Sequence, residues 1–128
     1  MRCLDTSFLI YLLKGLPAAA EKARAMDAVG ERLSVPAPVL TEVLRGAYFK
    51  GGKELHETLE LMASLDVLVV DDEVAAEAGR MGAELLKRGN DVGTIDLLIA
   101  ATAKLNRRIL VTRDSSFYGI PDVAVETY

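Results

Sequence analysis

Residues 93–103, GTIDLLIAATA, form an apolar stretch that carries one carboxylate, Asp96, near its beginning. Apolar residues spaced by three and four predict a helix here, and Thr94 is a suitable N-cap for it. An acid in a first helical turn interacts favourably with the free N–H groups there. Helix electrostatics alone can therefore explain Asp96, unless the rest of the chain supplies a second reason for a charge at this place.

Short strand-like segments alternate with longer helical segments on both sides of this stretch. Such alternation predicts a parallel sheet with helices on both faces. We therefore predict one α/β domain over residues 1–128, with a five-stranded, mostly parallel sheet. The predicted strands are MRCLD (1–5), RLSVPA (32–37), DVLVVD (66–71), RRILVT (107–112) and VAVETY (123–128). The predicted helices cover 7–15, 17–30, 38–51, 53–65, 73–89 and 94–106, and Gly30, Gly51, Gly89 and Asn106 stand where helices should stop.

The composition describes a globular, acidic chain. Of its 128 residues, 51% are hydrophobic and 27% are charged, and no apolar run reaches the roughly 18 residues of a membrane span. With a single cysteine and no recognisable signal peptide, we expect a cytoplasmic protein. A net charge of −4 and 5% aromatic residues argue against a protein that coats nucleic acid or stacks bases. An acidic nuclease remains compatible with these numbers.

Four acids follow strands or open helices in a way that can bring them to one edge of the sheet. Asp5 ends the first strand, Asp114 follows the fourth, Asp96 opens the helix between, and Glu42 lies early in the third helix. Ligands of open parallel sheets bind beyond the carboxyl ends of the strands. Carboxylates gathered there repel one another unless a cation compensates, and Mg²⁺ prefers such oxygen ligands. A metal-activated water that attacks a phosphodiester is the chemistry that suits this arrangement.

Each acid also has a local explanation. Asp5 can cap the helix that follows it, Asp114 can stabilise a turn, and Glu42 can pair with Arg45 three residues on. The Asp pair at 71–72 provides a comparison within the same chain, because it also follows an apolar strand and precedes a helix. We interpret that pair as capping the helix. Position after a strand is therefore weak by itself, and the joint pattern carries the prediction.

Four sequence blocks resemble the PIN domain, and especially the VapC toxins of VapBC toxin–antitoxin systems. The resemblance runs in the family's order over essentially the whole chain. The most specific part is D-x-x-IAATA followed by a strand and TRD. The blocks are LDTS (4–7), LTEVLRG (40–46), TIDLLIAATA (94–103) and ILVTRD (109–114).

The resemblance implies a metal-dependent endoribonuclease that acts as a toxin, with Mg²⁺ as its ion and Mn²⁺ able to substitute. It further implies a cognate VapB-type antitoxin, a homodimer, and an RNA substrate such as tRNA or rRNA. Motif by motif, the catalytic acids fall on Asp5, Glu42, Asp96 and Asp114, and the metal ligands on Asp5, Asp96 and Asp114. Supporting roles fall on Thr6, Ser7 and Thr112.

This chain departs from the family at Ser116, where many relatives carry an acid before the aromatic residue. That departure concerns the outer part of the metal site. Asp91, in the turn before Asp96, is interpreted as a turn residue. Two arginines beside the acids, Arg45 and Arg113, are candidates for contacts with RNA phosphates.

Other conspicuous residues have ordinary structural explanations. The single histidine, His56, lies among charged neighbours and is expected on a solvated helix face. The pair Gly79 and Gly82 is expected to permit close helix packing. Core packing is the expected use of the apolar residues Tyr48, Phe49, Leu55, Leu59 and Met62.

Two other functions compete with a nuclease. A phosphoacceptor receiver domain also has an acidic pocket, but it needs paired acids after the first strand and a lysine near the last one, and both are missing here. A catalytically inactive, dimerising partner-binding module would keep the fold without using the acids. Its difficulty is that four unused carboxylates in one place would destabilise the protein.

Overall fold

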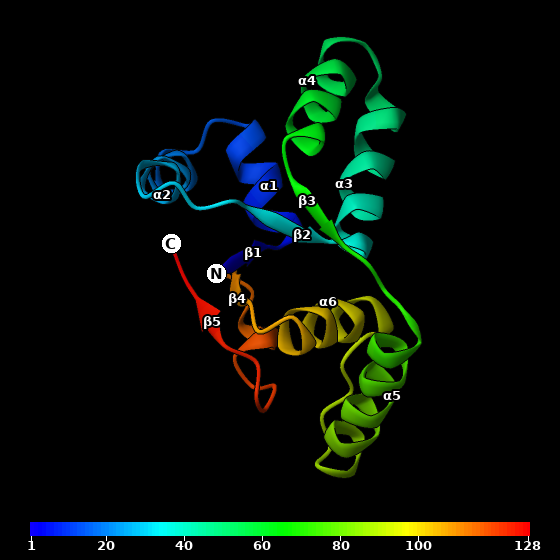
Figure 1. Cartoon of the computed structure of the whole chain (residues 1–128). Coiled ribbons are helices and arrows are strands. Elements are labelled where there is room, and N and C mark those ends of the chain that lie inside the picture. The colour runs from blue at the N-terminus through cyan, green and yellow to red at the C-terminus, as the bar shows by residue number, and fades with distance from the viewer.

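The computed structural model describes all residues, 1–128, and contains one five-stranded sheet (Figure 1). All five predicted strands form, each shorter than the pattern that predicted it. The sheet has the order β3-β2-β1-β4-β5, and every neighbouring pair is parallel. The strands are β1 (Arg2–Leu4), β2 (Ser34–Pro36), β3 (Asp66–Leu68), β4 (Ile109–Val111) and β5 (Val125–Glu126).

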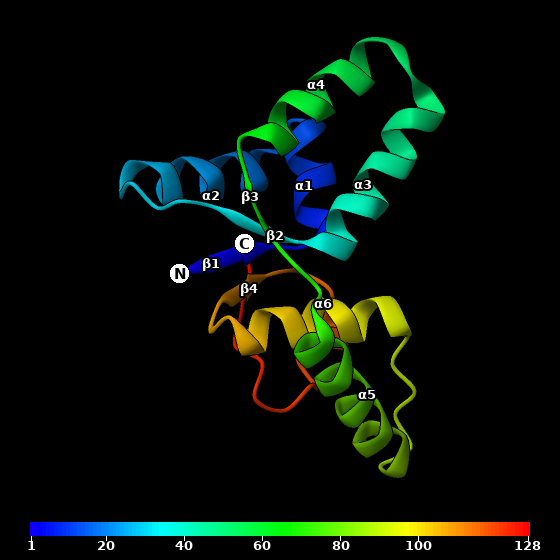
Figure 2. The ribbon, with the colours of Figure 1, turned by 45° about the vertical axis from the view of Figure 1, so that its right-hand side comes forward.

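Six α-helices cover the two faces of the sheet, as the alternating pattern predicts. Figures 1 and 2 show α1 to α4 on one side and α5 with α6 on the other. The helices are α1 (Thr6–Leu13), α2 (Pro17–Ala28), α3 (Ala37–Lys50), α4 (Gly52–Ala63), α5 (Asp72–Lys87) and α6 (Thr94–Leu105). A short 3₁₀ turn, η1 (Ser115–Phe117), follows β4.

The core is built on the central strands. Cys3 and Leu4 of β1 and Leu110 and Val111 of β4 are fully buried. Because both faces of these strands are covered, apolar residues follow one another without the alternation of a half-exposed strand. No helix in the structure combines the length and the apolarity that crossing a bilayer requires.

The predicted helix ends are largely confirmed. Gly51, with φ of 69°, separates α3 from α4, and Gly89, with φ of 79°, follows α5. Asp71 caps α5, because its side chain accepts a hydrogen bond of 2.9 Å from Val74 N. The capping role expected of Thr94 is wrong: Gly93 occupies the N-cap without a side-chain bond, and the helix begins at Thr94 itself.

The two glycines of α5 behave differently from each other. A Cβ added to Gly82 would lie 2.7 Å from Leu97 Cδ1, so this residue allows α5 and α6 to approach closely. Gly79 is exposed and a Cβ there would meet nothing within 4 Å, so its expected packing role is wrong.

The core role expected of the α3–α4 aromatic residues is also wrong. Phe49 is 91% exposed and Tyr48 is 61% exposed, because they lie on the outward side of the last turn of α3. Leu59 of α4 is exposed as well, Leu55 is half-buried, and only Met62 belongs to the core. The two helices therefore present apolar surface to solvent.

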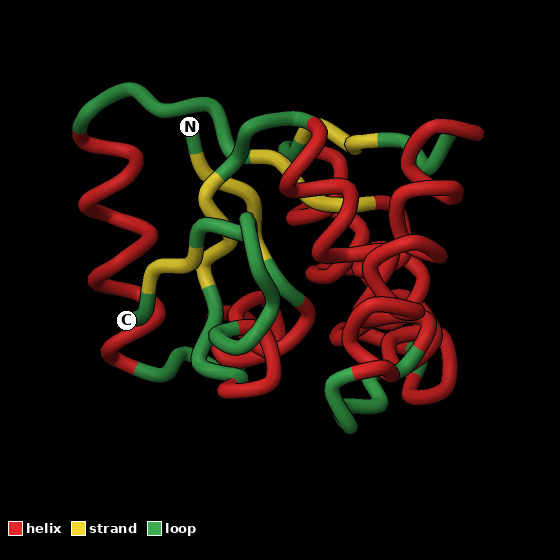
Figure 3. The backbone as a smooth tube through the Cα atoms, turned by 90° about the horizontal axis from the view of Figure 1, so that it is seen from below, coloured by secondary structure: helices red, strands yellow, loops and turns green.

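The strand order decides where a site can form. With β1 between β2 and β4, the carboxyl ends of these three strands lie side by side, and the chain leaves them into α1, α3 and η1. Figure 3 shows the strands in the middle of the molecule with helices around them. Residues 5, 42 and 114, which are far apart in sequence, are thereby carried to one edge of the sheet.

Candidate active site

Asp5 is the buried centre of this edge. It is the N-cap of α1, and its Oδ1 accepts a hydrogen bond of 2.8 Å from Phe8 N. Its Oδ2 accepts a second bond, of 2.5 Å, from the Thr112 hydroxyl. The local capping role of Asp5 is therefore real. A cap, however, needs one oxygen and an exposed carboxylate suffices, whereas Asp5 is only 3% exposed.

Thr112 connects Asp5 with Asp114. The Thr112 side chain is fully buried just after β4, and its hydroxyl oxygen also accepts a bond of 2.9 Å from Asp114 N. The chain turns outward at this point, so the Asp114 side chain is exposed. Its Oδ1 accepts bonds from Ser116 N, at 3.0 Å, and from the Ser116 hydroxyl, at 2.8 Å. Ser116 thus orients Asp114 while leaving Oδ2 without a protein donor.

Glu42 reaches the site from the first half of α3. Its Oε1 accepts a hydrogen bond of 2.6 Å from the Thr6 hydroxyl, which joins α3 to the first turn of α1. No ion pair joins Glu42 to Arg45, so the local alternative for this acid is excluded. Thr6 therefore contacts one of the four acids directly, across 36 positions of sequence.

Asp96 lies in the first turn of α6 and is partly buried. No protein group donates a hydrogen bond to its side chain, so both carboxylate oxygens are free of protein partners. Burial raises the pKa of Asp96 above its ordinary value, and the charges of Asp114 and Glu42 raise it further. A capping acid would gain from the helix N-terminus instead, so burial and acidic neighbours together outweigh the helix N-terminus at Asp96.

The electrostatics show that the four acids share one region. Burial raises the pKa of Asp5 above its ordinary value, although the bonds from Thr112 and Phe8 oppose this. The charges of Asp114 and Asp96 add to the rise in the pKa of Asp5, just as Asp114 and Glu42 act on Asp96. Like charges therefore act on one another across this edge of the sheet.

No basic residue compensates for them. The protein has ten ion pairs, and none includes Asp5, Glu42, Asp96 or Asp114. Other acids with an altered environment behave in the opposite way. Hydrogen bonds from Arg80 and Lys104, for example, lower the pKa of Glu77 to about 2. The carboxyl edge is thus a place where negative charge accumulates without a counter-ion from the protein.

These residues fit a hard divalent cation bound partly through water. No group of three or more acidic, His or Cys side chains is arranged to hold an ion between them directly. Mg²⁺ usually takes one or two protein carboxylates and keeps several waters, so it does not require such a group. The free oxygens of Asp96 and Asp114, beside uncompensated Asp5, are suitable donors for this kind of site.

The remaining candidate residues are placed less centrally. Ser7 lies in the first turn of α1, but its hydroxyl makes no hydrogen bond to the four acids. Arg45 is exposed on α3, one turn after Glu42, and has no ion-pair partner. Arg113 is also exposed and directly precedes Asp114. Both arginines are therefore free to contact an anion.

Two tyrosines near the site have no counterpart among the sequence predictions. The Tyr118 hydroxyl donates a bond of 3.2 Å to the Thr112 carbonyl oxygen, and the Tyr128 ring lies against Arg113. Nothing in the local sequence marks either residue, because η1 and β5 approach β4 only in the folded chain. Ser116, noticed only as a departure from the family, belongs with them as a partner of Asp114.

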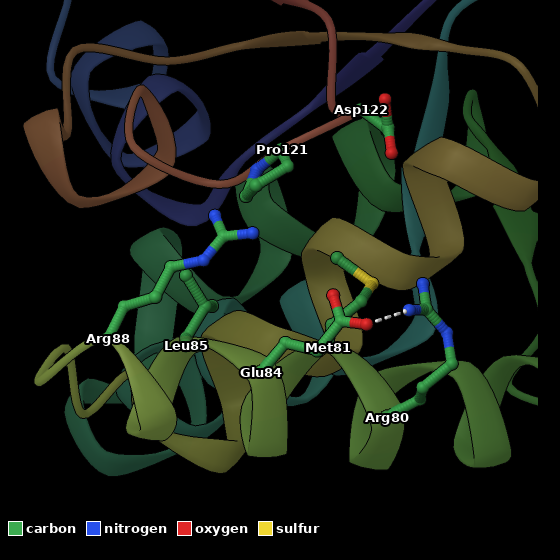
Figure 4. Close-up of a pocket in the computed structure, with 7 residues that line it drawn as sticks. All are labelled: Arg80, Met81, Glu84, Leu85, Arg88, Pro121 and Asp122. Atoms are coloured by element: carbon green, nitrogen blue, oxygen red, sulfur yellow. Dashed lines mark hydrogen bonds and ion pairs between the residues drawn. The ribbon is translucent and has the colours of Figure 1, made fainter.

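A separate small pocket contains none of the predicted site residues. It lies between α5 and the segment after η1, where Arg80 is bonded to Glu84 at 2.8 Å (Figure 4). Two arginines and two acids line it, so it has no strong preference for an anion or a cation. Its lining residues are Arg80, Met81, Glu84, Leu85, Arg88, Pro121 and Asp122.

The chain is similar to known proteins both in sequence and in fold. The PIN domain family model matches residues 2–123. Ribonuclease VapC1 of Haemophilus influenzae is 27% identical over 94% of this chain and 92% of its own length. The tRNA(fMet)-specific endonuclease VapC of Shigella flexneri is 27% identical over 88% and 85% of the two chains. In the DNA-bound VapBC of Salmonella typhimurium, one chain superposes with a TM-score of 0.81 at 26% identity, covering 99% of this chain and 98% of that one.

Proposed function

Because the chain belongs to the PIN domain family, we propose that it is a metal-dependent endoribonuclease that acts as the toxin of a toxin–antitoxin pair. The observation that carries the proposal is the accumulation of four uncompensated carboxylates at the carboxyl edge of the sheet. The names of its relatives, which include ribonuclease and tRNA(fMet)-specific endonuclease, agree with this chemistry.

Asp5, Asp96 and Asp114 would hold the metal, in part through bound water, with Mg²⁺ as the natural ion and Mn²⁺ as a substitute. Such an ion, when bound, lowers the pKa of water and stabilises the negative charge that develops on a phosphoryl group. Asp5 is fixed by Phe8 N and Thr112, so it contributes a carboxylate of constant position. Asp96 has no protein donor and is free to turn toward its ligand.

Glu42 and the arginines would act on the substrate side. Thr6 holds one oxygen of Glu42 and leaves the other free to orient the attacking water. Arg45 and Arg113 would contact RNA phosphates, which offsets the repulsion between RNA and an acidic site. The substrate class is tRNA or rRNA, in which unpaired loops expose the backbone to such a site.

The partner of this toxin would be a VapB-type antitoxin, and the toxin itself would form a homodimer. A groove of about 500 Å³ lies between α1, α3 and α4 and is lined in part by Ile10, Leu13 and Val43. An amphipathic antitoxin segment suits such a groove. Elsewhere on α3, the exposed Tyr48 and Phe49 provide further apolar contact area.

The test is cleavage of RNA by antitoxin-free protein and by Asp96→Asn, each with Mg²⁺, with Mn²⁺ and with chelator. We expect discrete cleavage that requires both metal and Asp96, with a loss of at least about 100-fold in the variant. The matched control is Asp72→Asn, which removes an acid from the first turn of α5 and should cleave as the wild type does.

Two results would contradict the proposal. Cleavage by Asp96→Asn at the wild-type rate would remove Asp96 from the site. Failure of the folded, antitoxin-free wild type to cleave under every condition would favour a partner-binding module without catalysis. Mapping the cleaved ends would identify the RNA.

A further inference from the structure

Tyr128 holds the Arg113 side chain at two points. Arg113 Nε donates a hydrogen bond of 2.7 Å to the main-chain oxygen of Tyr128. The guanidinium carbon also lies 4.4 Å from the centroid of the Tyr128 ring, within the range of a cation–π contact. An exposed arginine ordinarily samples many rotamers, so two contacts to one residue restrict it strongly.

The Tyr128 ring is itself anchored on the helix that Asp5 caps. It packs edge to face against Phe8, with centroids 4.9 Å apart, and lies 6.5 Å from Tyr11. Phe8 is fully buried, and its main-chain N–H donates the hydrogen bond that Asp5 Oδ1 accepts. Arg113 is therefore fixed relative to the buried carboxylate of Asp5, because Tyr128 contacts Arg113 and packs on α1, the helix that Asp5 caps.

The terminal nitrogens of Arg113 have no partner in the protein. Only Nε is hydrogen-bonded, and no Asp or Glu side chain lies within ion-pair distance, although Asp114 is the next residue. The terminal nitrogens of a guanidinium form a planar edge that matches two phosphate oxygens. The four uncompensated acids repel a polyanion, and a fixed cation beside them provides a point at which the polyanion can bind.

We propose that Tyr128 is a positioning residue that presets Arg113 to bind one backbone phosphate of single-stranded RNA beside the carboxylates. The inference rests on the proposed nuclease function for the identity of the polyanion. Fixing the guanidinium before binding removes the entropy loss of ordering a long side chain, so affinity depends on Tyr128 even though it does not touch the RNA.

The Tyr128 hydroxyl provides a matched control. It is buried and has no hydrogen-bond partner, so the hydroxyl contributes nothing to holding Arg113. Tyr128→Phe removes only the hydroxyl and keeps the ring and the main-chain oxygen. Tyr128→Leu removes the whole aromatic group and keeps the main-chain oxygen. Arg113→Gln removes the cation and leaves the packing of Tyr128 on α1 in place, which keeps the test valid if Tyr128→Leu folds poorly.

The experiment measures binding without cleavage, in the Asp96→Asn background. The probe is a short, fluorescently labelled, single-stranded RNA of mixed sequence, followed by anisotropy across a KCl series. Arg24→Gln is the control for net charge, because Arg24 is an exposed, unpaired cation on α2, a helix that supplies none of the four acids.

We expect Arg113→Gln to reduce the slope of log K against log salt by about 0.7, the value for one phosphate contact on a single strand. Tyr128→Leu should weaken binding by about two- to tenfold, the range for ordering one long side chain. The two losses should not add in the double variant. Tyr128→Phe and Arg24→Gln should bind as the parent does.

Unchanged binding by Tyr128→Leu, additive losses, or a loss in Tyr128→Phe equal to that in Tyr128→Leu would overturn the positioning role. Failure of the Asp96→Asn parent to bind the labelled RNA would overturn it as well. The nuclease proposal is judged separately, by wild-type cleavage with metal. Wild-type cleavage with the same KM in Tyr128→Leu would reject the present inference and leave the nuclease standing.

Discussion

At Asp96 two electrostatic effects of opposite sign act on one carboxylate. The N-terminus of α6 favours its charge, whereas burial and the charges of Asp114 and Glu42 disfavour it. The raised pKa of Asp96 means that the second group of effects is larger. The folded protein therefore binds a proton at this site more readily than the unfolded chain does. This lowers stability at neutral pH, and the penalty disappears as the pH falls through the raised pKa.

We accordingly predict that Asp96→Asn increases the free energy of unfolding of metal-free protein at pH 7. The increase should shrink as the pH falls through the raised pKa of the folded state, and it should vanish below 3.8, the ordinary pKa of an aspartate, where the wild-type carboxyl carries a proton in both states. Urea denaturation in chelator, at several pH values, measures it. Asp72→Asn should gain nothing, since it gives up about 0.3–1 kcal/mol of helix-dipole stabilisation. A destabilised Asp96→Asn would mean that the helix dipole dominates.

Among the elements, α5 and α6 pack against each other, and a glycine allows their close approach. Gly82 faces Leu97, and Leu97 directly follows Asp96 on α6. The position of a catalytic candidate therefore depends on the absence of a side chain on the neighbouring helix. Gly79, one turn earlier on α5, faces open space and has no such constraint.

This contrast predicts unequal effects of the same substitution on one helix. Gly79→Ala should stabilise the protein by about 0.5–1 kcal/mol, because alanine has the higher helix propensity. In Gly82→Ala the new methyl group would lie 2.7 Å from Leu97 Cδ1, so the end of the Leu97 side chain must shift, and this repacking reduces or cancels the same gain. Denaturant unfolding of both variants checks the difference, and equal stabilisation would show that Leu97 yields freely.

Over the whole molecule, charge is compensated unevenly. Near the amino ends of β1 and β3, Arg2 pairs with Glu31 and Arg32 pairs with Asp66. At the opposite edge the four acids have no such partners. The net charge of −4 therefore understates how negative the carboxyl edge is, and that edge is where a divalent cation is expected to bind.

We predict that Mn²⁺ raises the thermal midpoint of the wild type in a concentration-dependent way. A ligand at 100 times its Kd adds about 2.7 kcal/mol to the stability of the state that binds it. Asp96→Asn should lose most of this response and Asp72→Asn should keep it, as measured by scanning fluorimetry. An equal shift in all three proteins would indicate nonspecific binding to the acidic surface.

The amino-acid sequence by itself determined the order and type of the elements, the parallel sheet, most helix ends and the four candidate acids. These follow from patterns that act within a few residues: apolar period, capping and glycine at positive φ. Contacts between residues that lie far apart in sequence could not be predicted from such patterns. The Thr112–Asp5 bond joins positions 107 apart, and the Tyr128–Arg113 contact depends on the pairing of β4 with β5.

Only the tertiary structure decided which side chains face each other. It separated Gly82 from Gly79, exposed Tyr48 and Phe49, and showed that Asp5 is both a cap and a member of an acidic group. The physical reason is that burial and like-charge repulsion depend on distance in space, which the strand order sets and no local pattern records. The charge of Asp96 can be read from the sequence, but its acidic neighbours are brought to it by the fold.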